Sequence, residues 1–333
     1  MTLDDIASVI ESWTKIPVHK LTEDEATRLL HLEERIHKRV IGQNDAVNAV
    51  SRAIRRGRAD ITFKRRPVSF IFAGPTGVGK TELVKTIAEV MFDNEEALIR
   101  FDMSEFMEKH SVSKLIGSPP GYVGYDEAGQ LTEKVRRKPY SVILLDEIEK
   151  AHPEIFNLFL QILDDGRVSD SHGKIVNFEN TIIIMTTNAG SEFDSASIGF
   201  NSDNAVTLKN NVEKSLKERF RPEFLNRIDE IVTFSPLTEA ELKQIIDLML
   251  CDITGRMAQK GAEIKITDSA KELILKTGFD VKYGARPLKR AIQTLIEDKL
   301  ADFSLRHTIK EGMTIVADSR NDEIELTVIS QNI

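Results

Sequence analysis

Residues 74–81, Gly-Pro-Thr-Gly-Val-Gly-Lys-Thr, have the composition and spacing of a phosphate-binding loop. Its glycines let the backbone curl until successive N–H groups point at one anion. Lys80 can then reach the β and γ phosphates, and Thr81 offers its hydroxyl to Mg²⁺. A strand-like segment precedes the loop and a helical pattern follows it, which is the context that this loop requires. The sequence therefore predicts a nucleoside triphosphate site formed by Gly74, Pro75, Thr76, Gly77, Val78, Gly79, Lys80 and Thr81.

Two carboxylates end the next strongly apolar segment. Residues 142–145 read as a buried strand, and Asp146 and Glu147 follow it directly. A magnesium nucleotide site needs a carboxylate at such a strand end, so we expect Asp146 to hold Mg²⁺ through water. Glu147 is placed to orient and polarise the water that attacks the γ-phosphate. This second acid favours a hydrolase over a protein that only binds nucleotide.

The composition is that of a globular chain with more than one domain. The 333 residues exceed what one hydrophobic core usually holds, and 41% hydrophobic with 29% charged residues fits neither a disordered nor a membrane protein. A net charge of −8 argues against a general nucleic-acid binder. The basic runs at 52–58 and 64–66 fit solvated or intersubunit charge better than a nucleic-acid patch, which stays an alternative.

The single cysteine, Cys251, cannot form an intramolecular disulfide, and its apolar neighbours predict a core position. One cysteine also fits a reducing compartment. No segment approaches eighteen uninterrupted apolar residues, and the first residues lack the basic start of a secretion signal. We therefore expect a cytoplasmic protein with no membrane partner.

Strands and helices are expected to alternate through the middle of the chain. The alternation predicts an α/β fold with a parallel sheet flanked by helices. Helical periodicity precedes it over residues 1–39, where Leu29, Leu30, Leu32 and Ile36 form an apolar stripe. The expected strands are residues 68–73, 98–102, 142–146, 181–187 and 230–234.

The pattern changes after Pro236 to that of a smaller, mainly helical domain. Helices are expected at 239–259, 271–277 and 286–303, and alternating residues at 313–317 and 323–329 predict short strands. We therefore expect a helical lead-in at 1–39, a large ATPase domain at 40–236, and a C-terminal lid domain at 237–333 that ends in a short sheet.

Four further segments give the chain a resemblance to AAA+ P-loop ATPases. Thr186-Thr187-Asn188 ends a strand as a sensor-1 segment does, and Val40-Ile41-Gly42-Gln43 resembles the adenine-pocket box. Residues 224–229, Phe-Leu-Asn-Arg-Ile-Asp, are similar to an arginine-finger segment, and residues 284–287, Gly-Ala-Arg-Pro, resemble sensor 2.

More narrowly, the chain resembles the second ATPase module of peptidase-associating Clp unfoldases of the ClpC, ClpE and ClpA type. The similarity extends to Trp-Thr-Lys-Ile-Pro-Val at 13–18, Gly-Tyr-Val-Gly at 121–124 and Leu-Asp-Asp-Gly-Arg at 163–167. Proteins of this family normally also carry an N-terminal domain and a first ATPase module, so the resemblance implies an excised second ring with its linker.

The resemblance implies ATP and Mg²⁺ as cofactors and assigns roles to single residues. Val40 and Ile41 would line the base pocket, Asn188 would contact the γ-phosphate or the attacking water, and Arg286 would link lid orientation to nucleotide. Arg227 would act on the neighbouring subunit's nucleotide and so require a homo-oligomer, which in this family is a hexameric ring. Arg219 and Arg221 stay alternatives for that role.

The loop at 118–125 places Tyr122 and Val123 between glycines, where burial is difficult. By resemblance Tyr122 would line an axial pore and press on any extended polypeptide without reading its sequence. Residues 166–173 are a candidate second pore loop. The alternative is a packed turn with Tyr122 or Tyr125 folded inward.

A polar segment at 190–204 carries Ile198, Gly199 and Phe200 in its midst. The tripeptide resembles the loop with which Clp unfoldases dock onto the Clp peptidase, and disaggregase relatives lack such an insertion. In the alternative, Ile198 and Phe200 fold back as a local hydrophobic anchor.

The leading hypothesis is an ATP-driven unfoldase ring that threads protein substrates into an associated Clp serine peptidase. Neither a Gly-x-Ser-x-Gly segment nor a His-Glu-x-x-His segment occurs in the chain, so peptide cleavage would come from the partner. A disaggregase without a peptidase is the nearest alternative. A nucleotide-switched scaffold or assembly module is the alternative of another class, and Glu147 weighs against it.

Overall fold

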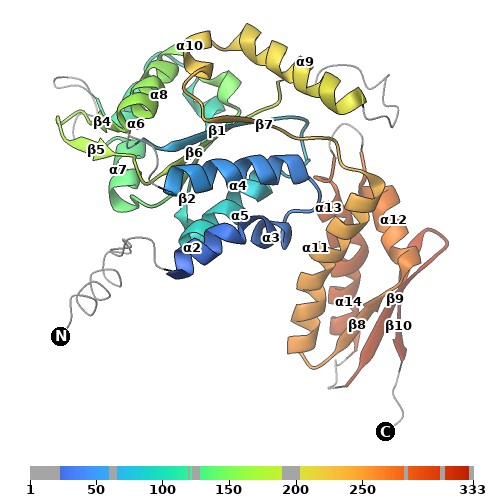
Figure 1. Cartoon of the computed structure of the whole chain (residues 1–333). Helices are drawn as coiled ribbons and strands as arrows, with labels where there is room; N and C mark the ends of the chain where they lie inside the picture. The colour runs from blue at the N-terminus through green and yellow to red at the C-terminus, as the bar shows by residue number, and fades with distance from the viewer. Residues whose placement is uncertain are drawn as a thin grey trace, which may run out of the picture. The chain divides into compact units, whose positions relative to one another are not determined.

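The protein is described by a computed structural model that covers residues 23–59, 66–118, 121, 128–189, 203–280, 284–307 and 312–329. The chain divides into two compact units, which are coloured along the chain in Figure 1. The first comprises Met1–Gly74 and Lys80–Phe234, and the second comprises Ser235–Ile333 with the loop residues Pro75–Gly79. Within the described ranges no helix is both long and apolar enough to cross a membrane.

A five-stranded parallel sheet forms the centre of the first unit, in the order β2-β3-β6-β1-β7. The α/β prediction is therefore confirmed. Three strands have the predicted bounds, whereas β6 begins one residue later and β7 ends one residue earlier than predicted. The strands are β1 (Val68–Ala73), β2 (Leu98–Asp102), β3 (Val142–Asp146), β6 (Ile182–Thr187) and β7 (Glu230–Thr233).

Helices cover both faces of this sheet because the central strands are mostly apolar on both sides. One face, with Ile71, Leu145 and Met185, packs against α6 (Ser111–Ile116), α7 (Gln130–Arg137) and α8 (Pro153–Asp165). Alternate residues point to the other face, where α4 (Asn44–Arg58) and α5 (Lys80–Phe92) lie beside the strands (Figure 1). The carboxyl ends of the strands thus meet at one edge between two layers of helices.

Two short helices precede α4. They are α2 (Glu23–Leu30) and α3 (Leu32–His37), and α3 contacts both α4 and α5. Leu29, Leu32 and Ile36 are buried, but Leu30 is 70% exposed. The predicted stripe was wrong at Leu30. Helix α2 ends at Leu30 and α3 begins at Leu32, so the four residues do not share one face of a continuous helix.

The remaining elements of the first unit connect its strands. A hairpin of β4 (Arg167–Ser169) and β5 (Ile175–Asn177) follows α8 directly. Helix α9 (Asp203–Arg219) and helix α10 (Pro222–Leu225) precede β7. Short 3₁₀ turns are η1 (Glu95–Ala97), η2 (Met103–Phe106) and η3 (Ile148–Lys150).

The second unit combines helices with a small sheet of order β10-β9-β8. Its core draws Leu242, Ile246, Leu250 and Ile253 from one stripe of α11. The predicted helical lid with a short terminal sheet is confirmed, although α12 begins three residues earlier than predicted. The elements are α11 (Glu239–Gln259), β8 (Glu263–Ile266), α12 (Asp268–Gly278), α13 (Leu288–Ile292), the π-turn η5 (Gln293–Glu297), α14 (Asp298–Arg306), β9 (Thr314–Arg320) and β10 (Glu323–Ile329).

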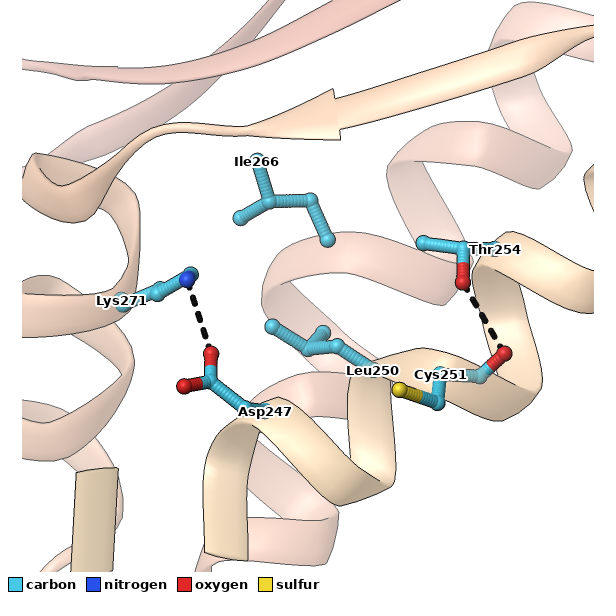
Figure 2. Close-up of a pocket in the computed structure, with 6 residues that line it drawn as sticks. All are labelled: Asp247, Leu250, Cys251, Thr254, Ile266 and Lys271. Atoms are coloured by element: carbon cyan, nitrogen blue, oxygen red, sulfur yellow. Dashed lines mark hydrogen bonds and ion pairs between the residues drawn. The ribbon is translucent and has the colours of Figure 1, made fainter. Parts of the chain in front are cut away.

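The core position predicted for Cys251 was wrong, because its side chain is exposed. The neighbouring Leu250 is buried, and one residue turns a helix by about 100°, so Cys251 leaves the buried stripe. Figure 2 shows the residue at a hollow of about 200 Å³ whose other lining residues are Asp247, Leu250, Thr254, Ile266 and Lys271.

Candidate functional site

The first residue of the phosphate loop is a glycine for steric reasons. Gly74 has φ +151°, and a Cβ there would lie 2.7 Å from the Phe234 carbonyl oxygen. Its N–H donates to the Thr187 carbonyl at 3.4 Å, where β1 and β6 end side by side. The predicted order of a strand, a glycine loop and a helix matches β1, residues 74–79 and α5.

Lys80 begins α5, and its ammonium group points back to the carboxyl ends of β1 and β6. Its Nζ donates to the Asn188 side-chain oxygen at 2.8 Å, to the Thr187 carbonyl at 3.1 Å and to the Gly74 carbonyl. The side chain is buried, with only 9% exposed. A buried ammonium is suited to an anionic ligand, because phosphate oxygens can replace such carbonyl acceptors with a stronger attraction.

The two predicted carboxylates stand together at the end of β3. Asp146 ends the strand, and Glu147 follows in the left-handed region with φ 55°. This conformation is costly for a residue with a side chain and is typical of functional turns. Thr186 fixes the turn, because its hydroxyl donates to Asp146 Oδ1 and accepts from the Glu147 N–H at 3.2 Å.

Arg100 on β2 pairs with the Asp146 carboxylate. The distance from its Nη2 to Asp146 Oδ2 is 2.6 Å, and the Asp146 side chain is 18% exposed. Adjacent to it, Asp102 is the partner of Asp146 in the strand register, and hydrogen bonds from Ser104 lower the pKa of Asp102. The ends of β2 and β3 therefore bring the carboxylates of Asp102 and Asp146 together with the guanidinium of Arg100.

Asn188 follows β6 and joins Lys80 to the acidic turn. Its side-chain oxygen accepts from Lys80, and its backbone N–H donates to Glu149 Oε1 at 3.2 Å. The other carboxylate oxygen, Glu149 Oε2, is buried without a hydrogen bond among the described residues. Because a buried acceptor of this kind normally has a partner, Glu149 Oε2 is a candidate acceptor for a donor that comes with a ligand.

Arg227 is anchored at the opposite edge of the sheet. Its carbonyl accepts from Arg66 at 3.2 Å, and the nearby Asp229 accepts from Arg66 at 2.6 Å and from the Ser69 N–H at 2.9 Å. Ser69 lies at the start of β1, whereas Lys80 and Asp146 gather where the parallel strands end. The Arg227 side chain forms an ion pair with Asp164 near the end of α8.

The other predicted residues are placed as follows. Val40 is buried and Ile41 half-buried, shortly after α3. Arg286 is exposed in the second unit, and its role toward nucleotide stays a prediction. Tyr122, Val123, Ile198, Gly199 and Phe200 lie outside the described residues.

Sequence reasoning missed Thr186, Arg100 and Glu149 as site residues. Thr186 was assigned to the sensor-1 segment without a role of its own, and its hydroxyl reaches Asp146 because β3 and β6 are neighbours. Arg100 carries no sequence signal of a site residue, because it alternates with apolar residues at an exposed position of β2. Glu149 shows no signal of this kind either.

The donor set at this edge fits Mg²⁺ and a nucleoside triphosphate. Mg²⁺ prefers hard oxygen ligands and is bound through one or two carboxylates together with substrate phosphates. Thr81 and Asp146 could supply the protein oxygens, with Lys80 and the N-terminus of α5 as the phosphate-binding groups. Glu147 would remain available beside them as a base.

Two family models match the chain. "AAA domain (Cdc48 subfamily)" covers residues 65–231, and "C-terminal, D2-small domain, of ClpB protein" covers residues 237–317. Together they match the larger part of both units.

Curated relatives are similar along nearly the whole chain. The chaperone protein ClpB of Aquifex aeolicus is 55% identical over 97% of this chain and 33% of its own length. The Bacillus subtilis negative regulator of genetic competence ClpC/MecB is 54% identical over 97% of the chain and 41% of its length. The ATP-dependent Clp protease ATP-binding subunit ClpC of Staphylococcus epidermidis is 52% identical over 98% of this chain and 41% of its own length. The chain thus spans about a third to two fifths of the length of these relatives.

Proposed function

The chain belongs to the AAA ATPases and carries the second ATPase module of the Clp chaperones, and from this premise we propose that it is one subunit of an ATP-driven protein-unfolding ring. The ring would thread polypeptides into an associated Clp serine peptidase. The observation that carries the proposal is the cluster of Lys80, Asp146, Glu147 and Asn188 at one edge of the sheet. A cytoplasmic compartment, expected from the single cysteine, belongs to the same proposal.

In the proposed reaction Lys80 binds the β and γ phosphates and Asn188 orients the terminal phosphate or the attacking water. Glu147 accepts a proton from that water as its oxygen bonds to the γ-phosphorus, and the bond from the γ-phosphorus to the β-phosphate oxygen breaks. Mg²⁺, when bound, neutralises charge on the phosphate oxygens. The left-handed turn at Glu147 supports this role because such an unfavourable backbone conformation is typical of functional sites.

The proposal includes the remaining assignments made by resemblance. Val40 and Ile41 would contact the base, Arg286 would sense nucleotide from the small domain, and Tyr122 with Val123 would grip the substrate. A boundary between domains at 236/237 is supported by family matches that stop at 231 and resume at 237.

Replacing Glu147 by Gln tests the motor. We expect ATP binding to be retained while steady-state hydrolysis falls by about 10²-fold or more, because the amide cannot accept the proton. Protein unfolding should fall with it, measured on a tagged fluorescent substrate. Unchanged hydrolysis and unfolding in the variant would contradict the motor and favour a nucleotide-switched scaffold.

A second candidate, a disaggregase that works without a peptidase, is favoured by the ClpB small-domain match and by the ClpB relatives. The two candidates differ at Ile198, Gly199 and Phe200. We expect the chain to bind its host's purified Clp peptidase in the presence of ATP and Mg²⁺, and a variant with these three residues replaced by Ala or Ser to lose that binding.

A matched control replaces three polar residues of the same segment, Asp194, Ser195 and Ser197, by Ala and should keep peptidase binding. Peptidase binding by the two variants is compared only if both hydrolyse ATP and assemble as the parent chain does. If the assembled parent ring does not bind the peptidase at all, the disaggregase is the better assignment.

A further inference from the structure

Arg39, which follows α3, contacts three carboxylates from two other elements. Its Nε and Nη2 donate to Glu82 Oε1 at 3.1 and 2.6 Å, and its Nη1 donates to Glu89 and, at 3.4 Å, to Glu95 Oε2. Glu82 and Glu89 are on α5, and Glu95 is in η1. A second cation, Lys85, lies 3.6 Å from Glu95 Oε1. The guanidinium is thus the centre of an acidic cluster on the surface of α5.

This cluster joins two parts of the proposed nucleotide site. Arg39 is followed directly by Val40 and Ile41, the candidate base-binding residues, and Glu82 directly follows Thr81 in the first turn of α5. One guanidinium therefore connects the segment that would hold the base with the helix that would hold the phosphates.

The segment after Arg39 is fixed at its other end as well. Val40 N–H donates to the Ile36 carbonyl at 2.9 Å, and the residues after Ile41, Gly42 and Gln43, have φ values of 66° and 53°. Two consecutive left-handed residues make a sharp turn into α4. Because both ends of the segment are held, its position relative to α5 depends on the hydrogen bonds that Arg39 donates to Glu82 and Glu89.

The contacts favour a fixed geometry more than a large stabilisation. The Arg39 side chain is 33% exposed, and ion pairs at such positions contribute only about 0–1 kcal/mol each. Burial lowers the pKa of Arg39, but hydrogen bonds to Glu89 and Glu82 outweigh it and raise that pKa above its usual value. A planar guanidinium that donates several bonds at once sets an orientation that a lysine cannot reproduce.

We propose that Arg39 is a positioning residue that holds the base-binding segment Val40–Ile41 against α5 and so strengthens binding of the nucleoside part of ATP. The inference rests on the proposed function, because it requires that the site at Lys80 binds ATP. It assigns Arg39 no contact with the nucleotide. Its effect should therefore appear for ligands with a base and be absent for phosphates alone.

The test compares ATP with inorganic tripolyphosphate, both with Mg²⁺, by titration calorimetry on the whole chain. We expect Arg39→Gln to weaken ATP binding about tenfold and tripolyphosphate binding less than about twofold. Because both affinities are measured on one preparation, a loss of folded protein lowers the number of binding sites and leaves the ratio of ATP affinity to tripolyphosphate affinity unchanged. Arg39→Lys keeps the positive charge but lacks the planar guanidinium, so it should also lower this ratio.

Arg35→Gln is the matched control. Arg35 is on the preceding helix, α3, and forms no ion pair within the described part of the chain. We expect it to change neither affinity.

Three results would overturn the inference. Equal weakening of both ligands in Arg39→Gln would show a general loss of positive charge, an unchanged ATP affinity would show that the cluster does not position the segment, and full recovery in Arg39→Lys would show that charge alone suffices. Failure of the proposed function looks different, because the parent chain itself would then bind neither ATP nor tripolyphosphate.

Discussion

Thr186 connects the two acids of the site through a single hydroxyl group. It accepts from the Glu147 N–H at 3.2 Å and donates to Asp146, and its side chain is almost fully buried. A left-handed residue needs such support, because its conformation is otherwise unfavourable. The position of the proposed base therefore depends on a residue that does not itself touch the nucleotide in the proposed reaction.

Replacing Thr186 by Val keeps the branched shape and removes both hydrogen bonds. We expect the turnover number for ATP to fall roughly 10- to 100-fold, because Glu147 loses its fixed position, while nucleotide affinity changes less than about threefold. Steady-state hydrolysis and fluorescent-nucleotide titration measure the two quantities.

Thr86→Val provides the control for losing a buried hydroxyl, because Thr86 is also buried and its hydroxyl donates to the Glu82 carbonyl at 2.8 Å. We expect this second variant to retain turnover. A Thr186→Val chain with normal turnover would mean that Glu147 is positioned without this contact.

The residues that were predictable from sequence are those whose role depends on neighbours along the chain. Lys80, Asp146 and Glu147 each stand at a fixed place after a strand, so their motifs could be read directly. Thr186 and Arg100 act on Asp146 from other strands, and which strands are neighbours is a property of the sheet order. Motif spacing contains no information on that order.

Glycines in two helices of the second unit differ in their surroundings. Gly255 is exposed on α11, and an added Cβ would meet no atom within 4 Å. Gly278 ends α12, where a Cβ would lie 2.8 Å from Ala291 Cβ and 2.9 Å from Leu288 Cα on α13. The close approach of α12 and α13 therefore requires a glycine at 278.

The two alanine substitutions should change stability in opposite directions. We expect Gly255→Ala to raise the free energy of unfolding of the second unit by about 0.5–1 kcal/mol, because alanine loses less backbone entropy in a helix. Gly278→Ala should lower it by about 1–3 kcal/mol through overpacking. Urea unfolding followed by circular dichroism measures the free energy of unfolding of both variants. An equal change in the two variants would show that α12 and α13 can separate at low cost.

An ion pair between α3 and α4 makes the stability of the first unit depend on pH. Arg55 Nη1 donates to Glu33 Oε2 at 2.7 Å, and this pairing lowers the pKa of Glu33 below its usual value. A carboxylate with a lowered folded pKa contributes stability above its unfolded pKa and loses it as pH falls through the folded pKa.

We therefore expect Glu33→Gln to destabilise the first unit by about 1 kcal/mol at pH 7. The difference from the parent chain should shrink as the pH falls from the usual pKa of a glutamate, about 4.3, through the lowered folded pKa of Glu33, because Glu33 is protonated first in the unfolded and then in the folded chain. Glu108→Gln, at an exposed position, should change stability little at either pH. A destabilisation that stays constant as pH falls would assign the effect of Glu33 to packing.

At the level of elements, long and regular patterns were predictable and short ones were not. Helix α11 has the predicted bounds, because its stripe of apolar residues repeats over 21 residues. Strand β8 was not predicted, since its four residues alternate only twice and its pairing partner, β9, lies far along the chain. Cys251 shows the same limit, because apolar neighbours in sequence do not place a helical residue on the buried stripe.

On the scale of the whole molecule, Arg227 is the residue that, in its proposed role as an arginine finger, would make the activity depend on a ring. Its backbone is tied to Arg66, and its side chain pairs with Asp164 near the end of α8, shortly before the β4–β5 hairpin. An arginine held in this way would act on a neighbouring subunit in the proposed ring, where it would stabilise charge on the transferred phosphate.

Mixing two inactive variants tests this arrangement. A Glu147→Gln subunit cannot hydrolyse its own nucleotide but can supply Arg227 to its neighbour. An Arg227→Ala subunit keeps Glu147 for its own nucleotide but cannot supply the arginine. If the arginine acts between subunits, a 1:1 mixture should recover about one quarter of the parent activity per site, because that fraction of sites pairs an intact Glu147 with an intact neighbouring Arg227. If it acts within one subunit, the mixture stays inactive, since no chain carries both residues. A control mixture of Glu147→Gln with the parent chain measures how much the variant subunits lower the activity of the parent subunits in the same ring. The activity recovered in the test mixture is corrected for this loss before action between subunits is compared with action within one subunit.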